Sequence, residues 1–162
     1  MDLPSGEKIE QGIVLKTLKL EKTLTDLAQT KFSGYLALTI DSSTGIEEGA
    51  VLFREGKIIA AVYEYGQVKL IHYGETAFQE FMNALHAPHG VLDIYQLSKQ
   101  QAELIVAFNE KMKAEHEVKD LKNLLAAKFS NQYSQQALIQ APGAYQSKIA
   151  VMKKLGLLDI ER

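Results

Sequence analysis

The sequence contains no cysteine. This absence excludes disulfide bonds, thiol nucleophiles and thiolate metal ligands, and it fits a reducing compartment. An excess of one charge is also lacking, because 18 Lys and Arg residues stand against 20 Asp and Glu residues, for a formal net charge of −2. No basic field draws the chain as a whole to nucleic acid or to acidic lipid, so we expect neither nucleic acid nor membrane as a partner.

Long apolar runs are missing as well. No window approaches the roughly 18 consecutive apolar residues of a membrane span. The N-terminal residues lack the apolar core and the small-residue cleavage site of a signal peptide. We therefore expect a cytoplasmic protein. With 162 residues, 46% of them hydrophobic and 23% charged, the chain is long enough for one ordinary globular domain, or for one domain with an appendage.

Motifs for catalysis and cofactor binding are lacking too. The glycines stand singly, so none of them forms the cluster between a strand and a helix that holds phosphates. No Gly-x-Ser-x-Gly elbow and no His-Glu-x-x-His pattern occurs. His86 and His89 have the spacing of a ligand pair but no Asp or Glu close by, and His116 is expected on a solvated helix face. We expect no metal, no cofactor and no enzyme activity.

What is present is a dense strand pattern between residues 32 and 65. Apolar residues alternate with others over 35–40, and two polar, glycine-containing segments follow at 41–45 and 54–57. Residues 58–65 are nearly apolar on both faces, which predicts a central strand. Glu47 and Glu48 are neighbours on a strand and point to opposite faces, so we expect solvated charge at a strand edge rather than a catalytic pair.

The remaining pattern predicts an α+β fold. We expect an antiparallel four- to five-stranded sheet covered by helices, with a helical C-terminal extension. Further strands are predicted at 8–16 (a helix being the alternative), 68–73 and 91–95. Helices are predicted at 18–30, 76–85, 98–112, 118–129 and 145–155. The expected units are a sheet domain (1–97), a helical extension that packs on the sheet or on a partner (98–141), and a C-terminal helix and tail (142–162).

Details of these helices rest on local signals. Thr76–Gln79 and Ser98–Gln101 each match a capping box, in which two side chains satisfy amide groups at a helix start. The apolar rhythm lapses at 113–117, so one long helix is solvated there or two helices meet near His116.

Two sets of residues are candidates for an interaction surface. Tyr63 and Tyr65 share one strand face, and Tyr73 is expected beside them across a hairpin at 66–67. These rings either cover the sheet edge or form an aromatic recognition surface. The apolar stripe of Val118, Leu121 and Leu125 packs either on the sheet or on another chain.

The central stretch resembles known families. The strings Phe32-Ser-Gly-Tyr-Leu36, Glu48-Gly-Ala-Val-Leu-Phe-Arg-Glu-Gly-Lys-Ile-Ile-Ala-Ala61 and Tyr63-Glu-Tyr-Gly66 resemble a group of uncharacterised archaeal proteins. They resemble more distantly the PatA-type domain of unknown function found in bacterial response regulators and gliding-motility proteins. The match covers about residues 18–98. It implies a non-enzymatic signalling or scaffold module and brings no catalytic residues with it.

Function is therefore expected to lie in binding. The main hypothesis is a non-catalytic, cytoplasmic regulatory or protein-interaction module whose partner is another protein or a second copy, with the C-terminal helices as the route of self-association. A first alternative is a sensor that holds a small molecule between the sheet and a helix. A second is an enzyme whose site is assembled from scattered groups such as His72, Asp93 and Tyr95.

Overall fold

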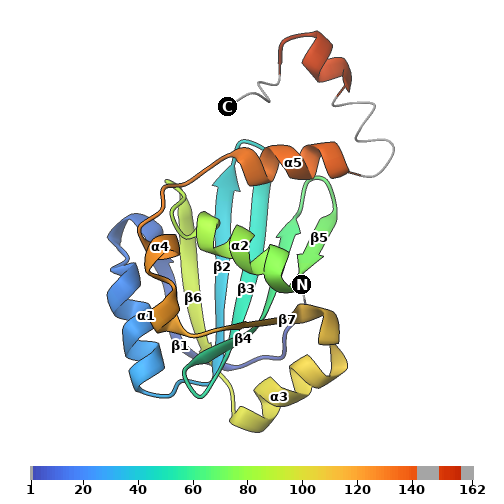
Figure 1. Ribbon diagram of the computed structural model, residues 1–162. Coiled ribbons are helices and arrows are strands. Elements are labelled where there is room, and N and C mark those ends of the chain that lie inside the picture. The colour runs from blue at the N-terminus through green and yellow to red at the C-terminus, as the bar shows by residue number, and fades with distance from the viewer. Residues whose placement is uncertain (1, 142–149, 158–162) are drawn as a thin grey trace.

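The computed structural model describes residues 2–141 and 150–157 and has the α+β architecture predicted from the sequence (Figure 1). Its antiparallel sheet has seven strands, more than the four to five expected. Six of them follow one another in the order β1-β6-β2-β3-β4-β5. Their bounds are Glu7–Val14 (β1), Gly90–Gln96 (β6), Gly34–Ser42 (β2), Gly45–Arg54 (β3), Lys57–Tyr65 (β4) and Leu70–Tyr73 (β5).

The seventh strand, β7 (Lys113–His116), lies where helix was predicted. The first half of β4 pairs with β7 and the second half with β5, so both strands share one edge of β4. Side chains of β7 alternate between exposed Lys113 and Glu115 and buried Ala114. Four residues with a single small apolar side chain carry too weak an alternation to be recognised in sequence.

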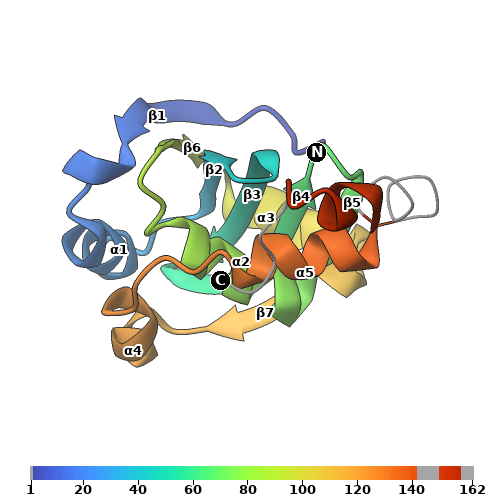
Figure 2. The same cartoon turned by 90° about the horizontal axis from the view of Figure 1, so that it is seen from above.

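Helices cover both faces of the sheet. One face carries α1 (Leu20–Gln29), α2 (Gly74–Ala84) and α5 (Gln132–Gln140), and Figure 2 shows α2 and α5 together on one side of the strands. The opposite face carries α3 (Lys99–Phe108), whose Ala102 and Ile105 contribute to the same apolar core as Leu52 and Val62 of the sheet. The alternation of strand side chains thus supplies two cores, one to each helical layer.

Helix boundaries agree with the predictions only in part. The Ser98–Gln101 capping box is confirmed, with both reciprocal hydrogen bonds present. The Thr76–Gln79 box is wrong, because α2 begins two residues earlier, at Gly74. The helix predicted at 98–112 ends at Phe108 and is followed by a 3-10 turn, η2 (Glu110–Met112).

The segment predicted as a helix at 118–129 consists of two short elements instead. They are a 3-10 turn, η3 (Val118–Asp120), and a single helical turn, α4 (Lys122–Leu125). The helix α5 that follows was not predicted. Of the helix predicted at 145–155, residues 145–149 lie outside the described part of the chain, and 150–154 are helical.

Candidate functional site

The tyrosines of the expected aromatic surface do not form one. Tyr63 and Tyr65 are 2% and 1% exposed and belong to the core beneath α2 and α5. Tyr73 pairs with Val62 across β4 and β5, and antiparallel partners share a face, so Tyr73 lies on the opposite side of the sheet. There the Lys111 ammonium lies 3.9 Å from the centre of its ring.

The apolar stripe after β7 is also committed within this chain. Val118 and Leu121 are buried in the same core as Tyr63 and Tyr65, and Leu125 packs against it partly buried. These side chains cover the sheet in cis, the first of the two possibilities considered. They therefore offer little surface to a second chain.

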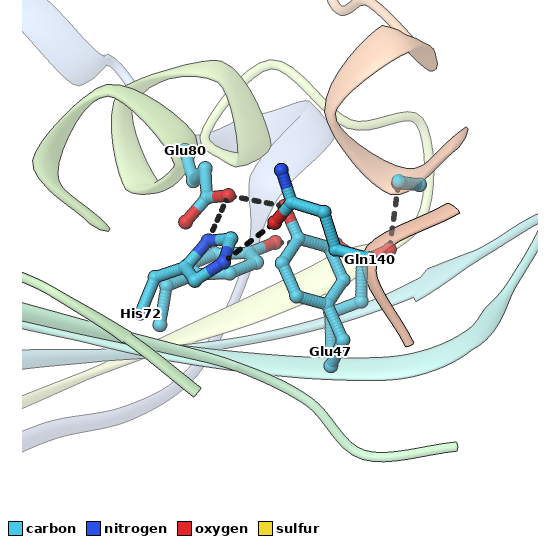
Figure 3. A network of polar contacts seen from close by, with 7 residues as sticks. Glu47, His72, Glu80 and Gln140 are labelled. Atoms are coloured by element: carbon cyan, nitrogen blue, oxygen red, sulfur yellow. Dashed lines mark hydrogen bonds and ion pairs between the residues drawn. The ribbon is translucent and has the colours of Figure 1, made fainter. Parts of the chain in front are cut away.

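Beneath α5 the structure reveals a buried polar network that centres on Glu47 (Figure 3). Glu47 is 3% exposed, so the expectation of solvated charge holds for its exposed neighbour Glu48 but is wrong for Glu47 itself. Its Oε1 accepts hydrogen bonds from Ser42, from Thr44 at 3.0 Å and from Ser134 of α5 at 2.7 Å. Its Oε2 accepts one from the Tyr63 hydroxyl at 2.6 Å.

Glu80 of α2 is the second buried carboxyl of the network, and sequence analysis missed it. Its Oε1 accepts a hydrogen bond from the Tyr65 hydroxyl at 2.8 Å and lies 2.7 Å from His72 Nδ1. Its Oε2 is buried and has no hydrogen-bond partner among the described residues. Burial raises the pKa of Glu80 above its ordinary value, against the opposing effect of the His72 and Tyr65 hydrogen bonds.

His72 links this carboxyl to α5. Its Nε2 lies 3.1 Å from Gln140 Oε1, and Figure 3 shows the imidazole between Glu80 and Gln140. Both ring nitrogens of this strand histidine therefore have hydrogen-bond partners. One signal in the sequence could have located this network. Glu47 is an even number of residues from Val51 and Phe53, which lie in the core, so its side chain points to the same buried face of the strand.

The hydrogen bonds of this network connect helices to strands. Burial and the adjacent carboxylates raise the pKa values of Tyr63 and Tyr65, so both phenols stay protonated donors near neutral pH. Each hydroxyl and both imidazole nitrogens already have a protein partner. The contacts therefore tie α2 and α5 to β3, β4 and β5.

The scattered enzyme site does not assemble. His72 lies on β5, whereas Asp93 and Tyr95 lie on β6, and three strands separate the two in the sheet order. Asp93 Oδ1 accepts a hydrogen bond from the Gly12 amide at 2.6 Å, and Tyr95 stacks on Tyr35 with 4.8 Å between ring centres.

Two of the other three histidines, His86 and His116, have structural partners as well. His86 Nε2 lies 2.8 Å from the Leu124 carbonyl oxygen, which belongs to α4 rather than to its own helix. His116 is half-buried rather than solvated: it stacks on Phe78 and contacts Glu75. Among the described residues, no cluster of three or more His, Cys, Asp or Glu side chains could hold a metal ion.

A groove of about 610 Å³ lies on the other face of the sheet, between α3 and the β4–β5 hairpin. We call it the α3 groove. Its floor is formed by side chains of β4 and β5, its walls by α3 with the turn that follows and by the N-terminal residues. The lining residues are Asp2, Leu3, Pro4, Val62, Glu64, Ile71, Tyr73, Gln101, Leu104, Ile105, Phe108, Asn109 and Met112.

Large apolar side chains stand exposed along this groove. Phe108 is 83% exposed, Leu104 54% and Ile71 41%. Leu104 and Phe108 are four residues apart on α3 and so lie on one helix face. The N-terminal wall is anchored, since the Tyr35 hydroxyl donates to the Pro4 carbonyl at 3.1 Å. The sequence contains a signal for this surface. Residues 102–108 include more apolar side chains than one buried helix face can hold, so some of them must be exposed.

Comparison with known proteins identifies a family region. The family model DUF2226, described as an uncharacterized protein conserved in archaea, matches residues 1–109. Every residue that lines the α3 groove lies within the match except Met112. Comparisons with curated proteins and with solved structures give no match. In the described residues no helix combines the length and the apolarity needed to cross a bilayer.

Proposed function

We propose that this chain, which belongs to a family of uncharacterized proteins conserved in archaea, is a non-catalytic cytoplasmic interaction module that binds an amphipathic helix of a partner protein. The binding site is the α3 groove. The exposure of Leu104 and Phe108 beside an apolar groove is the observation that carries the proposal. Helix-in-groove recognition uses apolar anchors at the same three- and four-residue spacing.

The chemistry of the groove favours a basic helix. Asp2 and Glu64 contribute carboxylates to a lining that is otherwise mainly apolar. A partner helix with Lys or Arg beside its apolar stripe would bury the stripe and keep its charges near these carboxylates. The distant resemblance to the PatA-type domain of response regulators suggests that such binding serves signalling.

A small apolar molecule is the second candidate, favoured by the size of the groove. Its volume of about 610 Å³ lies within the ordinary range of small-molecule sites. It also lies between the sheet and a helix, as the sensor hypothesis requires. A small ligand would leave Phe108 uncovered at the rim, whereas a helix would cover it, and for this reason we favour the helix.

Fluorescence anisotropy with a labelled amphipathic Leu/Lys helical peptide tests the proposal. We expect Leu104→Ser/Phe108→Ser to weaken binding at least tenfold, because each lost anchor contributes about 1.5–3 kcal/mol when buried. Val91→Ser, which removes an exposed apolar side chain from β6, is the control and should bind as the wild type does. Equal affinities for all three proteins, or equal binding of a scrambled peptide, would contradict the proposal.

A further inference from the structure

The chain itself carries a helix of the kind that the groove suits. Residues 150–154 are helical. Val151 on this helix is 56% exposed, and Leu155 and Leu157, which follow it, are each 66% exposed. Lys153 and Lys154 add positive charge to the same segment. Figure 1 shows this helix apart from the sheet, beyond the end of α5.

We propose that residues 150–157 dock into the α3 groove of their own chain and compete there with the partner helix. This inference rests on the proposed function of the groove. Val151 and Leu155 are four residues apart, which matches the spacing of Leu104 and Phe108 on α3. The two lysines complement the carboxylate of Asp2 in the groove lining.

The position of α5 brings this segment within reach. Gln140, at the end of α5, contacts His72 on β5. The neighbouring Ile71 points to the other face and lines the groove. β5 is the last strand in the order, so it lies at an edge of the sheet. A chain segment can pass from one face of the sheet to the other around this edge.

The connecting chain is long enough for this path. Eight residues separate Ala141 from Ala150 in the sequence, and eight residues correspond to a maximum reach of about 25–30 Å, whereas packed sheets lie about 10 Å apart. Because the groove and the segment 150–157 belong to one chain, docking in cis has the advantage of an intramolecular event over docking between chains at ordinary concentrations.

Distance measurement between two spin labels tests the docking directly. Labels at Gln100→Cys on α3 and Ala150→Cys report on the groove and on the helix, and the absence of native cysteine makes labelling specific. Both positions are exposed and neither lines the groove. We expect a narrow distance distribution that dilution leaves unchanged and that Val151→Asp/Leu155→Asp broadens. A broad distribution in the wild type, or one that narrows only at high concentration, would overturn docking in cis.

A binding experiment separates this inference from the function on which it rests. The Leu/Lys peptide is titrated into the full chain and into Val151→Asp/Leu155→Asp, with Val91→Asp as the matched control. Because the double variant no longer docks residues 150–157 into the groove, its affinity for the peptide should be about tenfold higher than that of the wild type. The affinity of the control should be unchanged. Equal affinities that still depend on Leu104 and Phe108 would contradict cis docking but keep the groove function. Binding that depends on neither would contradict both.

Discussion

Glu47 is the residue on which most hydroxyl groups of the buried network converge. Four hydroxyls donate to its two oxygens, one of them from α5. Several hydrogen-bond donors stabilise a buried carboxylate. Replacing the carboxylate with a neutral group weakens all of these hydrogen bonds. The side chain thus couples the hairpin of β2 and β3 to a helix nearly ninety residues away in sequence.

We expect Glu47→Gln to lower the free energy of unfolding by about 2 kcal/mol, because a carboxylate held by four donors becomes an amide that must itself donate. Glu48→Gln is the matched control, since Glu48 is the exposed neighbour on the same strand and its loss should cost about 0–0.5 kcal/mol. Urea unfolding of the two variants measures the difference. Equal midpoints would show that the network does not stabilise the fold.

Glu80 predicts a dependence of stability on pH. Its pKa in the folded state is raised above the ordinary 4.5, so the folded protein retains a proton that the unfolded chain has already released. The free energy of unfolding should therefore fall as pH rises from about 4.5 through the raised value. Urea unfolding at a series of pH values should show this slope in the wild type and less of it in Glu80→Gln. Identical slopes in both would contradict the shift.

At the scale of elements, the β2–β3 and β3–β4 hairpins were predictable, whereas the turn expected at 66–67 spans 66–69 and the buried network was not predictable. The turns were predictable because each polar segment between apolar strands contains a glycine, Gly45 or Gly56, and both glycines have positive φ. β7 was missed because its four residues carry little apolar alternation. Glu47 and Glu80 were missed because their partners come from α5 and β5, and contacts so distant in sequence leave no local pattern.

The hairpin between β3 and β4 provides a prediction at this scale. Gly56 has φ +82°, and a Cβ there would lie 2.5 Å from the Ala28 carbonyl oxygen in α1. Gly12 has φ +70° with open space around it. Gly12→Ala should cost about 1 kcal/mol through backbone strain alone, and Gly56→Ala about 3 kcal/mol because the hairpin must also move off α1. Thermal unfolding compares them; equal losses would show that the hairpin does not pack on α1 as described.

At the scale of the whole molecule, the two faces of the sheet have different characters. One face is covered by α2 and α5, with the buried network beneath them. The C-terminal helices that were expected to mediate self-association contribute part of their side chains to the core on this face. The other face holds the α3 groove with exposed Leu104 and Phe108. The family match ends near the end of α3, so it includes strands β1–β6 with α1, α2 and α3 and leaves β7, α4 and α5 outside. The exposed apolar side chains are the reason that we propose the groove face as the recognition surface.

The most direct test of this assignment is an amide NMR titration of the ¹⁵N-labelled full chain, carrying Val151→Asp/Leu155→Asp, with the amphipathic Leu/Lys peptide. The account predicts saturable shift changes confined to α3, to β5 around Ile71 and to the N-terminal residues around Leu3. Shift changes that map to α2 and α5, or no saturable change at all, would contradict it.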